Sequence, residues 1–165
     1  MKTFYSNDTL IFLFLFFVCP FIQSQEKPKT LPTPPFTIDL WEKGLPNSNG
    51  MEAQGYDDAK NNFRPSITVF LPVASHPTKA VIVCPGGGYQ SLALNHEGYD
   101  LAPFFNNLEI AVIVLKYRMP NGNHEVPISD AYEAMRLTKS HAKEWNINPD
   151  CIGIMGFSAG GHLAS

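Results

Sequence analysis

The stretch Gly156-Phe157-Ser158-Ala159-Gly160-Gly161 sets a serine among small residues, a pattern that suits nucleophilic chemistry. A serine hydroxyl is a weak nucleophile, so an enzyme must expose it, orient it and supply a base. A sharp turn from a strand into a helix achieves the first two, and crowding there favours glycine two positions before and after the serine. The helix N-terminus adds N–H groups near a developing oxyanion. The motif therefore predicts a nucleophile at Ser158; the alternative is a plain Gly-Ser turn that caps a helix.

A second glycine-rich turn, Pro85-Gly86-Gly87-Gly88-Tyr89, directly follows the apolar run KAVIVC at 79–84. Ligands bind at such turns when they follow a strand of a doubly wound sheet. The residues after the glycines form neither G-x-G-x-x-G nor a P-loop with its lysine, which argues against a dinucleotide site. No His, Cys or Asp spacing resembles a zinc site, and we expect neither a metal nor a cofactor. A flexible glycine turn would explain these glycines alone, but not the serine motif.

Buried strands alternate with amphipathic helices around the two motifs, which predicts an α/β fold with a mostly parallel, doubly wound central sheet. Continuous apolar runs indicate strands buried on both faces, and a stripe at helical spacing indicates a helix packed on the sheet. The predicted strands cover 36–41, 67–71, 79–84, 110–117 and 151–155, and the predicted helices cover 97–108, about 128–145, and the chain from Ser158 onward. We predict a loop at 42–64 and a turn at 148–150.

The N-terminal 24 residues have the pattern of a secretory signal peptide. Lys2 precedes an unbroken apolar run at 10–18, and cleavage fits best after Ser24. The alternative is an uncleaved anchor, but the run is shorter than the roughly 20 residues that a membrane span needs. We therefore expect a secreted or periplasmic protein with no stable membrane span. The organisation is a signal peptide at 1–24, a proline-rich linker and N-terminal loop segment at 25–65, and a partial α/β domain at 66–165.

The overall composition supports a folded domain with no affinity for nucleic acid. Hydrophobic residues make up 44% of the chain, which excludes a wholly disordered protein. The formal net charge is −3, and nucleic-acid binding usually needs a clustered basic surface.

Together the two motifs resemble the α/β-hydrolase superfamily across residues 66–165. The stretches VIVCPGGGY, NHEGYDLA, VIVLKYRMP, ISDAYEAMRL and INPDCIGIMGFSAGGHLAS are similar to the carbohydrate-esterase branch near acetyl xylan esterases and hormone-sensitive-lipase-like enzymes. The resemblance implies ester hydrolysis through an acyl-enzyme at Ser158, with an oxyanion hole made by the N–H groups of Gly87, Gly88 and Ala159. It implies a small-molecule or polysaccharide ester as substrate. Pro85 stands where the superfamily usually has histidine, as in the acetyl xylan esterase-like branch.

Two other functions share part of this pattern. A serine peptidase of the prolyl-oligopeptidase type has a similar G-x-S-x-G-G turn, but those peptidases typically use a tyrosine as oxyanion donor, so the glycine turn favours the esterase. The other alternative is a binding protein without catalytic activity.

The superfamily's strand order also bears on the two cysteines that follow the signal peptide. It places the strand at 79–84 beside the strand at 151–155, running parallel. Cys84 then ends one strand and Cys151 begins the other, well over the ~7 Å that a disulfide can span. We predict no disulfide between them.

The sequence does not contain a complete catalytic triad in the superfamily's order. The superfamily's order is Ser, then Asp or Glu, then His, and only seven residues follow Ser158. His162 lies in the same predicted helix and suits a packing or capping role. His96, His124 and His141, with Asp130 or Asp150 as partner, suit structural or solvated roles better than that of a base. We therefore expect the N-terminal part of an exported serine esterase, inactive alone and exposing apolar sheet surface, with the triad Asp and His outside this chain.

Overall fold

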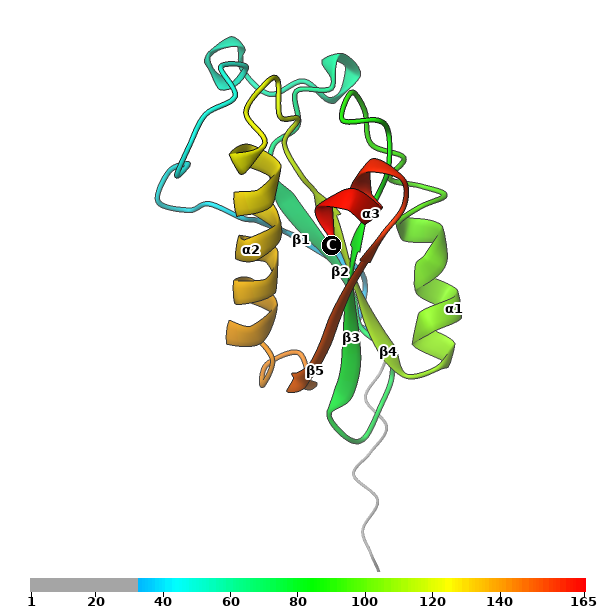
Figure 1. The fold of residues 1–165 in the computed structure, drawn as a ribbon. Coiled ribbons are helices and arrows are strands. Elements are labelled where there is room, and N and C mark those ends of the chain that lie inside the picture. Colours follow the sequence, from blue (N-terminus) through cyan, green and yellow to red (C-terminus); the bar gives the residue numbers. More distant parts are fainter. Residues whose placement is uncertain (1–32) are drawn as a thin grey trace, which may run out of the picture.

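Residues 33–165 are described by a computed structural model, and their strands form one five-stranded sheet in the order β1-β2-β4-β3-β5 (Figure 1). β2 runs antiparallel to both of its neighbours, whereas β4, β3 and β5 run parallel. The strands are β1 Phe36–Asp39, β2 Ser66–Phe70, β3 Thr78–Cys84, β4 Ile110–Lys116 and β5 Ile147–Gly156. The predicted signal peptide and its cleavage site after Ser24 lie outside the described residues.

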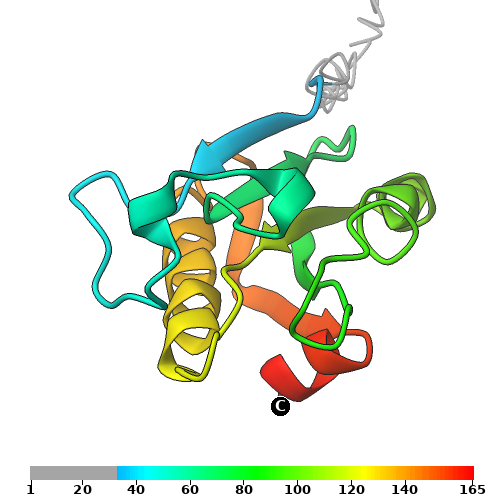
Figure 2. The same cartoon turned by 90° about the horizontal axis from the view of Figure 1, so that it is seen from above.

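Helices cover both faces of the sheet, so the predicted α/β class is confirmed. α1 (Ala102–Asn107) packs on one face and α2 (Glu125–Ser140) on the other (Figure 2). Successive strand residues point to opposite faces, which divides the core in two. Val83 of β3 packs with Ala102 on the α1 side, and Ile82 belongs to the larger cluster with Ala134 of α2. Between residues 33 and 165, no helix is long and apolar enough to cross a membrane.

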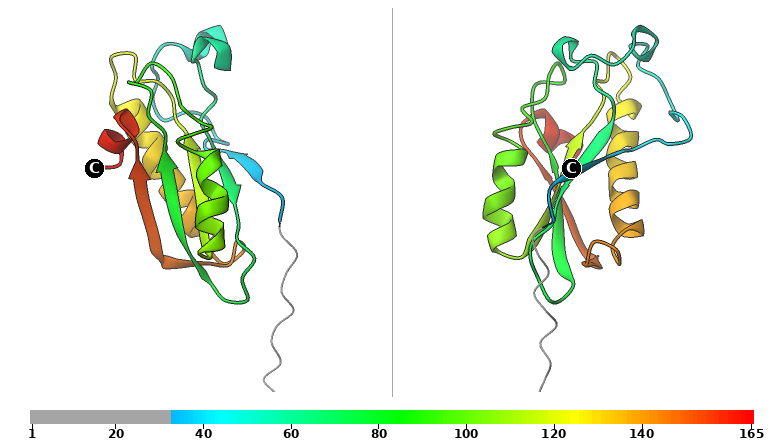
Figure 3. Two further views of the ribbon diagram at one scale, coloured as in Figure 1. Left: turned by 90° about the vertical axis from the view of Figure 1, so that its right-hand side faces the viewer. Right: turned by 180° about the vertical axis from the view of Figure 1, so that it is seen from behind.

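The parallel strands bring the two glycine motifs to the same end of the sheet. In the register of β3 and β5, Cys84 lies opposite Gly156, so the turn at 85–88 and the serine turn follow neighbouring strand ends. α3 (Ala159–Leu163) begins directly after the serine and lies at this end of β5 (Figure 3). The sheet thus positions the two motifs side by side, although 70 residues separate them along the chain.

Some element boundaries differ from the predictions. The turn predicted at 148–150 is wrong, because β5 already begins at Ile147, which pairs with Thr78. A register shift between Thr78 and Ala80 accommodates the proline-containing segment inside the strand. α2 begins at Glu125 instead of 128 and has Pro127 in its first turn, where no intrahelical N–H bond is lost. The helix predicted at 97–108 is a short 3-10 helix, η3 (Tyr99–Leu101), followed by α1.

The segment predicted as loop at 42–64 carries two short 3-10 helices, η1 (Glu52–Gln54) and η2 (Asp58–Lys60), and is tied to the end of β4 by Arg118, which contacts Asn47 and Glu52. Arg118 Nη2 lies 2.7 Å from Asp130 Oδ1, and both side chains are almost fully buried. Arg118 Nη1 also donates to the Asn47 carbonyl (2.8 Å). Removing one partner of such a pair would leave an uncompensated buried charge, at a cost of about 3–5 kcal/mol.

The two cysteines lie on neighbouring strands and are well separated along them, as predicted, although Cys151 lies near the middle of β5 and not at its beginning. Cys84 ends β3, whereas Cys151 precedes Ile152, which pairs with Ala80 near the beginning of β3. Both thiols are free. Burial raises the pKa of Cys84 to about 12, so this thiol stays protonated and unreactive at neutral pH.

Candidate active site

Ser158 occupies a tight turn between β5 and α3. Its backbone has φ 48° and ψ −118°, and its side chain is exposed. A non-glycine residue with such a backbone costs on the order of 1–3 kcal/mol and is found mainly where a site requires it. The predicted strand-to-helix turn is therefore present, and it presents the Ser158 hydroxyl to solvent.

Two glycines of the motif are required by close packing. A Cβ on Gly156 would lie 2.1 Å from the carbonyl oxygen of Gly160, and a Cβ on Gly160 would lie 2.0 Å from the carbonyl oxygen of Cys84. The same Cys84 oxygen accepts a hydrogen bond from the Phe157 N–H (3.1 Å). The turn around Ser158 is thus fixed against the end of β3, from which the second motif begins.

The glycine-rich turn touches the serine turn. A Cβ on Gly86 would lie 3.1 Å from the Ser158 Cβ and 2.7 Å from the Phe157 carbonyl oxygen. The turn 85–88 and the nucleophile candidate are therefore in direct contact, as the sequence motifs require if they act together.

The carbonyl groups of Gly86 and Gly87 point toward residues 90–93. Gly86 O accepts the Ala93 N–H (2.9 Å), and Gly87 O accepts the N–H groups of Gln90 and Ser91 (3.0 and 3.1 Å). In a trans peptide the N–H points opposite to the carbonyl of the same unit, so the N–H groups of Gly87 and Gly88 face away from residues 90–93.

Three backbone donors near the serine have no acceptor. Among the described residues, no protein atom accepts a hydrogen bond from the N–H of Gly87, Gly88 or Ala159. Ala159 is the first residue of α3, where an N–H has no intrahelical partner. Free N–H groups beside an exposed serine are what an oxyanion hole requires. Ala159 directly follows Ser158, and Gly87 directly follows Gly86, which packs against Ser158.

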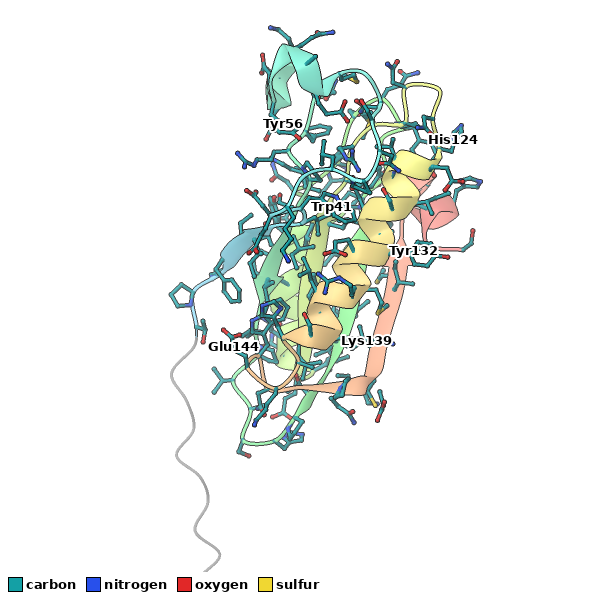
Figure 4. All side chains as sticks on the ribbon, turned by 90° about the vertical axis from the view of Figure 1, so that its left-hand side faces the viewer. Trp41, Tyr56, His124, Tyr132, Lys139 and Glu144 are labelled. Carbon is teal, nitrogen blue, oxygen red and sulfur yellow. The ribbon has the colours of Figure 1, made fainter. Side chains whose placement is uncertain are left out.

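His162 and His124 pack around Tyr89 and do not reach the serine hydroxyl. The Tyr89 hydroxyl lies 2.9 Å from His162 Nδ1. The ring of His124 meets the Tyr89 ring edge-on, with centroids 5.8 Å apart. His124 lies at the N-terminal end of α2, close to α3 (Figure 4). Burial raises the pKa of Tyr89, which keeps its hydroxyl protonated. His162 therefore has the packing role expected of it.

The other candidates for a base or its partner are engaged elsewhere or remote. His141 caps the far end of α2, stacking on Trp145 with ring centroids 4.8 Å apart. Asp130 forms a buried ion pair with Arg118, and Asp150 lies in the first half of β5. His96 is exposed in the loop after the glycine turn. Within residues 33–165, no histidine forms a hydrogen bond with the Ser158 hydroxyl.

Two further side chains hold the glycine turn, and the sequence patterns did not single them out. The Tyr117 hydroxyl donates to the Pro85 carbonyl (2.7 Å), and Glu97 Oε2 accepts the Gly86 N–H (2.7 Å). Burial raises the pKa of Tyr117 far above its ordinary value, so the hydroxyl remains a donor. The stretches NHEGYDLA and VIVLKYRMP contain these residues, but their contact depends on tertiary structure.

A serine at a strand-to-helix turn, beside a glycine-rich turn with free N–H groups at the carboxyl ends of parallel strands, defines the class: this is the fold and site arrangement of α/β-hydrolases. Residues 67–165 match the family model BD-FAE, and the chain belongs to this family.

Relatives within this class carry names of ester hydrolases. The acetylxylan esterase of Xylanibacter ruminicola is 46% identical over 97 residues, which cover 58% of this chain and 20% of that protein. The acetyl ester-xyloside bifunctional hydrolase of Caldicellulosiruptor lactoaceticus superimposes with a TM-score of 0.63 at 39% identity, over 78% of this chain and 44% of that one. MGS-M1, an α/β hydrolase from a Medee basin deep-sea metagenome library, gives a TM-score of 0.56 at 31% identity, over 60% of this chain and 43% of that one. The chain spans about a fifth of the length of the curated relatives it matches.

The packing of α3 on β3 predicts unequal effects of alanine at two adjacent glycines. Gly160→Ala must push α3 off the Cys84 carbonyl and is expected to destabilise the protein by about 3 kcal/mol. Gly161→Ala is the matched control, because its Cβ would lie 3.2 Å from the nearest atom and needs only a small shift. Urea unfolding of the complete gene product measures both. Equal stability of the two variants would contradict this packing.

Proposed function

We propose that this protein is a serine-dependent esterase in which Ser158 is the nucleophile and the N–H groups of Gly87, Gly88 and Ala159 form the oxyanion hole. The observation that carries the proposal is the contact between the exposed Ser158 and a turn in which the N–H groups of Gly87 and Gly88 lack acceptors. Each donor of an oxyanion hole typically contributes about 10²–10³ in kcat, because it stabilises charge that develops only in the transition state.

The reaction would proceed in two steps. Ser158 Oγ attacks the ester carbonyl carbon and gives its proton to a base, while the carbonyl oxygen takes up negative charge among the three N–H groups. The C–O bond to the alcohol then breaks, and the alcohol leaves with the proton. A water molecule attacks the resulting acyl-serine in the same way and releases the carboxylic acid and free Ser158.

We place the base and its acidic partner outside these 165 residues. The order in α/β-hydrolases is Ser, then Asp or Glu, then His, and the chain matches only about a fifth of its acetylxylan esterase relative. The histidines near Ser158 support this placement, because His162 and His124 contact Tyr89 instead. An open reading frame that continues past Ser165 and supplies Asp and His within about 120 residues would complete the triad.

Acyl esters of polysaccharides, acetyl esters foremost, are the proposed substrates. The names of the relatives, an acetylxylan esterase and an acetyl ester-xyloside hydrolase, support this class. Aryl acetates and acetylated xylan should be cleaved, whereas prolyl amides should not. Cleavage of prolyl amides in preference to esters would favour the prolyl-oligopeptidase alternative.

Ser158→Ala in the complete gene product is expected to lower kcat for an aryl acetate by at least about 10³-fold, because the variant lacks the hydroxyl that attacks the ester carbonyl. The same change should abolish labelling by a fluorophosphonate, and digestion of the labelled wild type should find the label on the peptide with Ser158. Ser140→Ala, at an exposed serine whose hydroxyl bonds to the Leu137 carbonyl and to His141 Nδ1, is the matched control and should change neither result. Full activity of Ser158→Ala would refute the proposal.

We also propose that the protein is exported and loses its first 24 residues. The apolar run at 10–18 after Lys2, followed by the small residue Ser24, supports this. Mass spectrometry of the protein recovered from the periplasm or medium of an expressing bacterium should then find Gln25 as the first residue. Recovery of the protein only in membranes, with Met1 retained, would contradict cleavage.

A further inference from the structure

The peptide unit that enters the glycine-rich turn is held at both ends by side chains. This unit joins Pro85 to Gly86, and its carbonyl accepts the Tyr117 hydroxyl at 2.7 Å. Its N–H donates to Glu97 Oε2, also at 2.7 Å. Hydrogen bonds to an ionised carboxylate are roughly twice as strong as neutral ones, so the Glu97 bond is a strong constraint on the orientation of this unit.

The two peptide units that follow, which carry the N–H groups of Gly87 and Gly88, are held through their carbonyl oxygens alone. Gly87 has φ 140° and Gly88 has φ 63°. Glycine adopts positive and negative φ about equally readily, so the backbone at these two positions is not restricted by a side chain. The donors to the carbonyl oxygens of Gly86 and Gly87 belong to the neighbouring loop, in which Gln90 and Ser91 are exposed and Ala93 is half-buried. Gly86, in contrast, is buried against the turn of Ser158.

Glu97 lies close to the nucleophile without touching its hydroxyl. A Cβ on Gly86 would lie 2.8 Å from Glu97 Oε2 and 3.1 Å from the Ser158 Cβ, so the carboxylate and the serine flank the same backbone atom. A negative charge in this position would repel the developing oxyanion and could not stabilise it. A base would need a hydrogen bond with Ser158 Oγ, but Glu97 Oε2 accepts the Gly86 N–H instead. The geometry fits a residue that acts through Gly86.

We infer that Glu97, together with Tyr117, is a positioning residue for the oxyanion hole: it fixes the peptide unit at 85–86 and thereby aims the N–H groups of Gly87 and Gly88 at the substrate. The inference rests on the proposed function of Ser158 and adds residues to it. Loss of the carboxylate would let the turn sample other conformations in which one or both donors miss the oxyanion, whereas substrate binding away from the carbonyl would be unaffected.

Glu97→Ala in the complete gene product is expected to lower kcat for an aryl acetate by about 10- to 100-fold with KM changed less than threefold, because a misdirected donor is lost only in the transition state. Glu97→Gln should restore kcat to within about threefold of the wild type, because its amide oxygen accepts the same N–H. Tyr117→Phe removes the other bond and should lower kcat in the same way as Glu97→Ala. Rates of fluorophosphonate labelling should follow kcat in all three.

The control is Asp57→Ala, which also removes a carboxylate that accepts a backbone N–H, that of Ala59, but whose hydrogen bonds reach neither turn. It should leave kcat unchanged. Glu97→Gln as inactive as Glu97→Ala, or with a displaced pH profile, would overturn the inference in favour of proton transfer by the carboxylate. Wild-type kcat in Glu97→Ala, with Ser158→Ala inactive, would overturn the inference alone. Activity in Ser158→Ala would overturn the proposed function itself.

Discussion

The carbonyl oxygen of Cys84 is the point on which the candidate site depends. It accepts the Phe157 N–H at 3.1 Å, and it leaves no room for a side chain at Gly160. One strand end therefore sets the position of the serine turn and, one residue later, begins the glycine-rich turn. The glycine-rich turn follows Cys84 at the end of β3, and the serine turn follows Gly156 at the end of β5, directly opposite Cys84. The relative placement of the two turns is therefore a property of the sheet register between β3 and β5.

The end of β4 supports this arrangement from the α2 side. Tyr117 directly follows β4 and holds the Pro85 carbonyl, and its neighbour Arg118 is buried against Asp130 of α2. The Trp41 indole N–H also donates to Asp130, at 2.8 Å. The ion pair thus links α2, the end of β4 and the segment after β1. Its burial fixes the backbone at Arg118, the residue next to Tyr117.

The sequence predicted the strands around both motifs, because buried strands and tight turns leave strong local patterns. The adjacency of these strands, and with it the separation of Cys84 from Cys151, was implied by the resemblance to α/β-hydrolases. The turn predicted at 148–150 failed because Asn-Pro-Asp usually breaks a strand, and here a register shift next to Thr78 retains it. Glu97 and Arg118 were not assigned roles, because charged residues give no periodic signal and their partners, Gly86 and Asp130, are defined only by the tertiary fold. The roles of Ser158, Gly87, Gly88 and Ala159 in catalysis stay predictions.

The central claim is that the N–H groups beside Ser158 are already aimed at an oxyanion. A crystal structure of the complete protein, inhibited with an organophosphonate, tests it most directly, because the phosphonyl oxygen stands in for the oxyanion of the ester reaction. We expect phosphorus bonded to Ser158 Oγ and the phosphonyl oxygen about 2.7–3.1 Å from the nitrogens of Gly87 and Ala159. A phosphonyl oxygen directed to solvent, or an adduct on another residue, would contradict the claim.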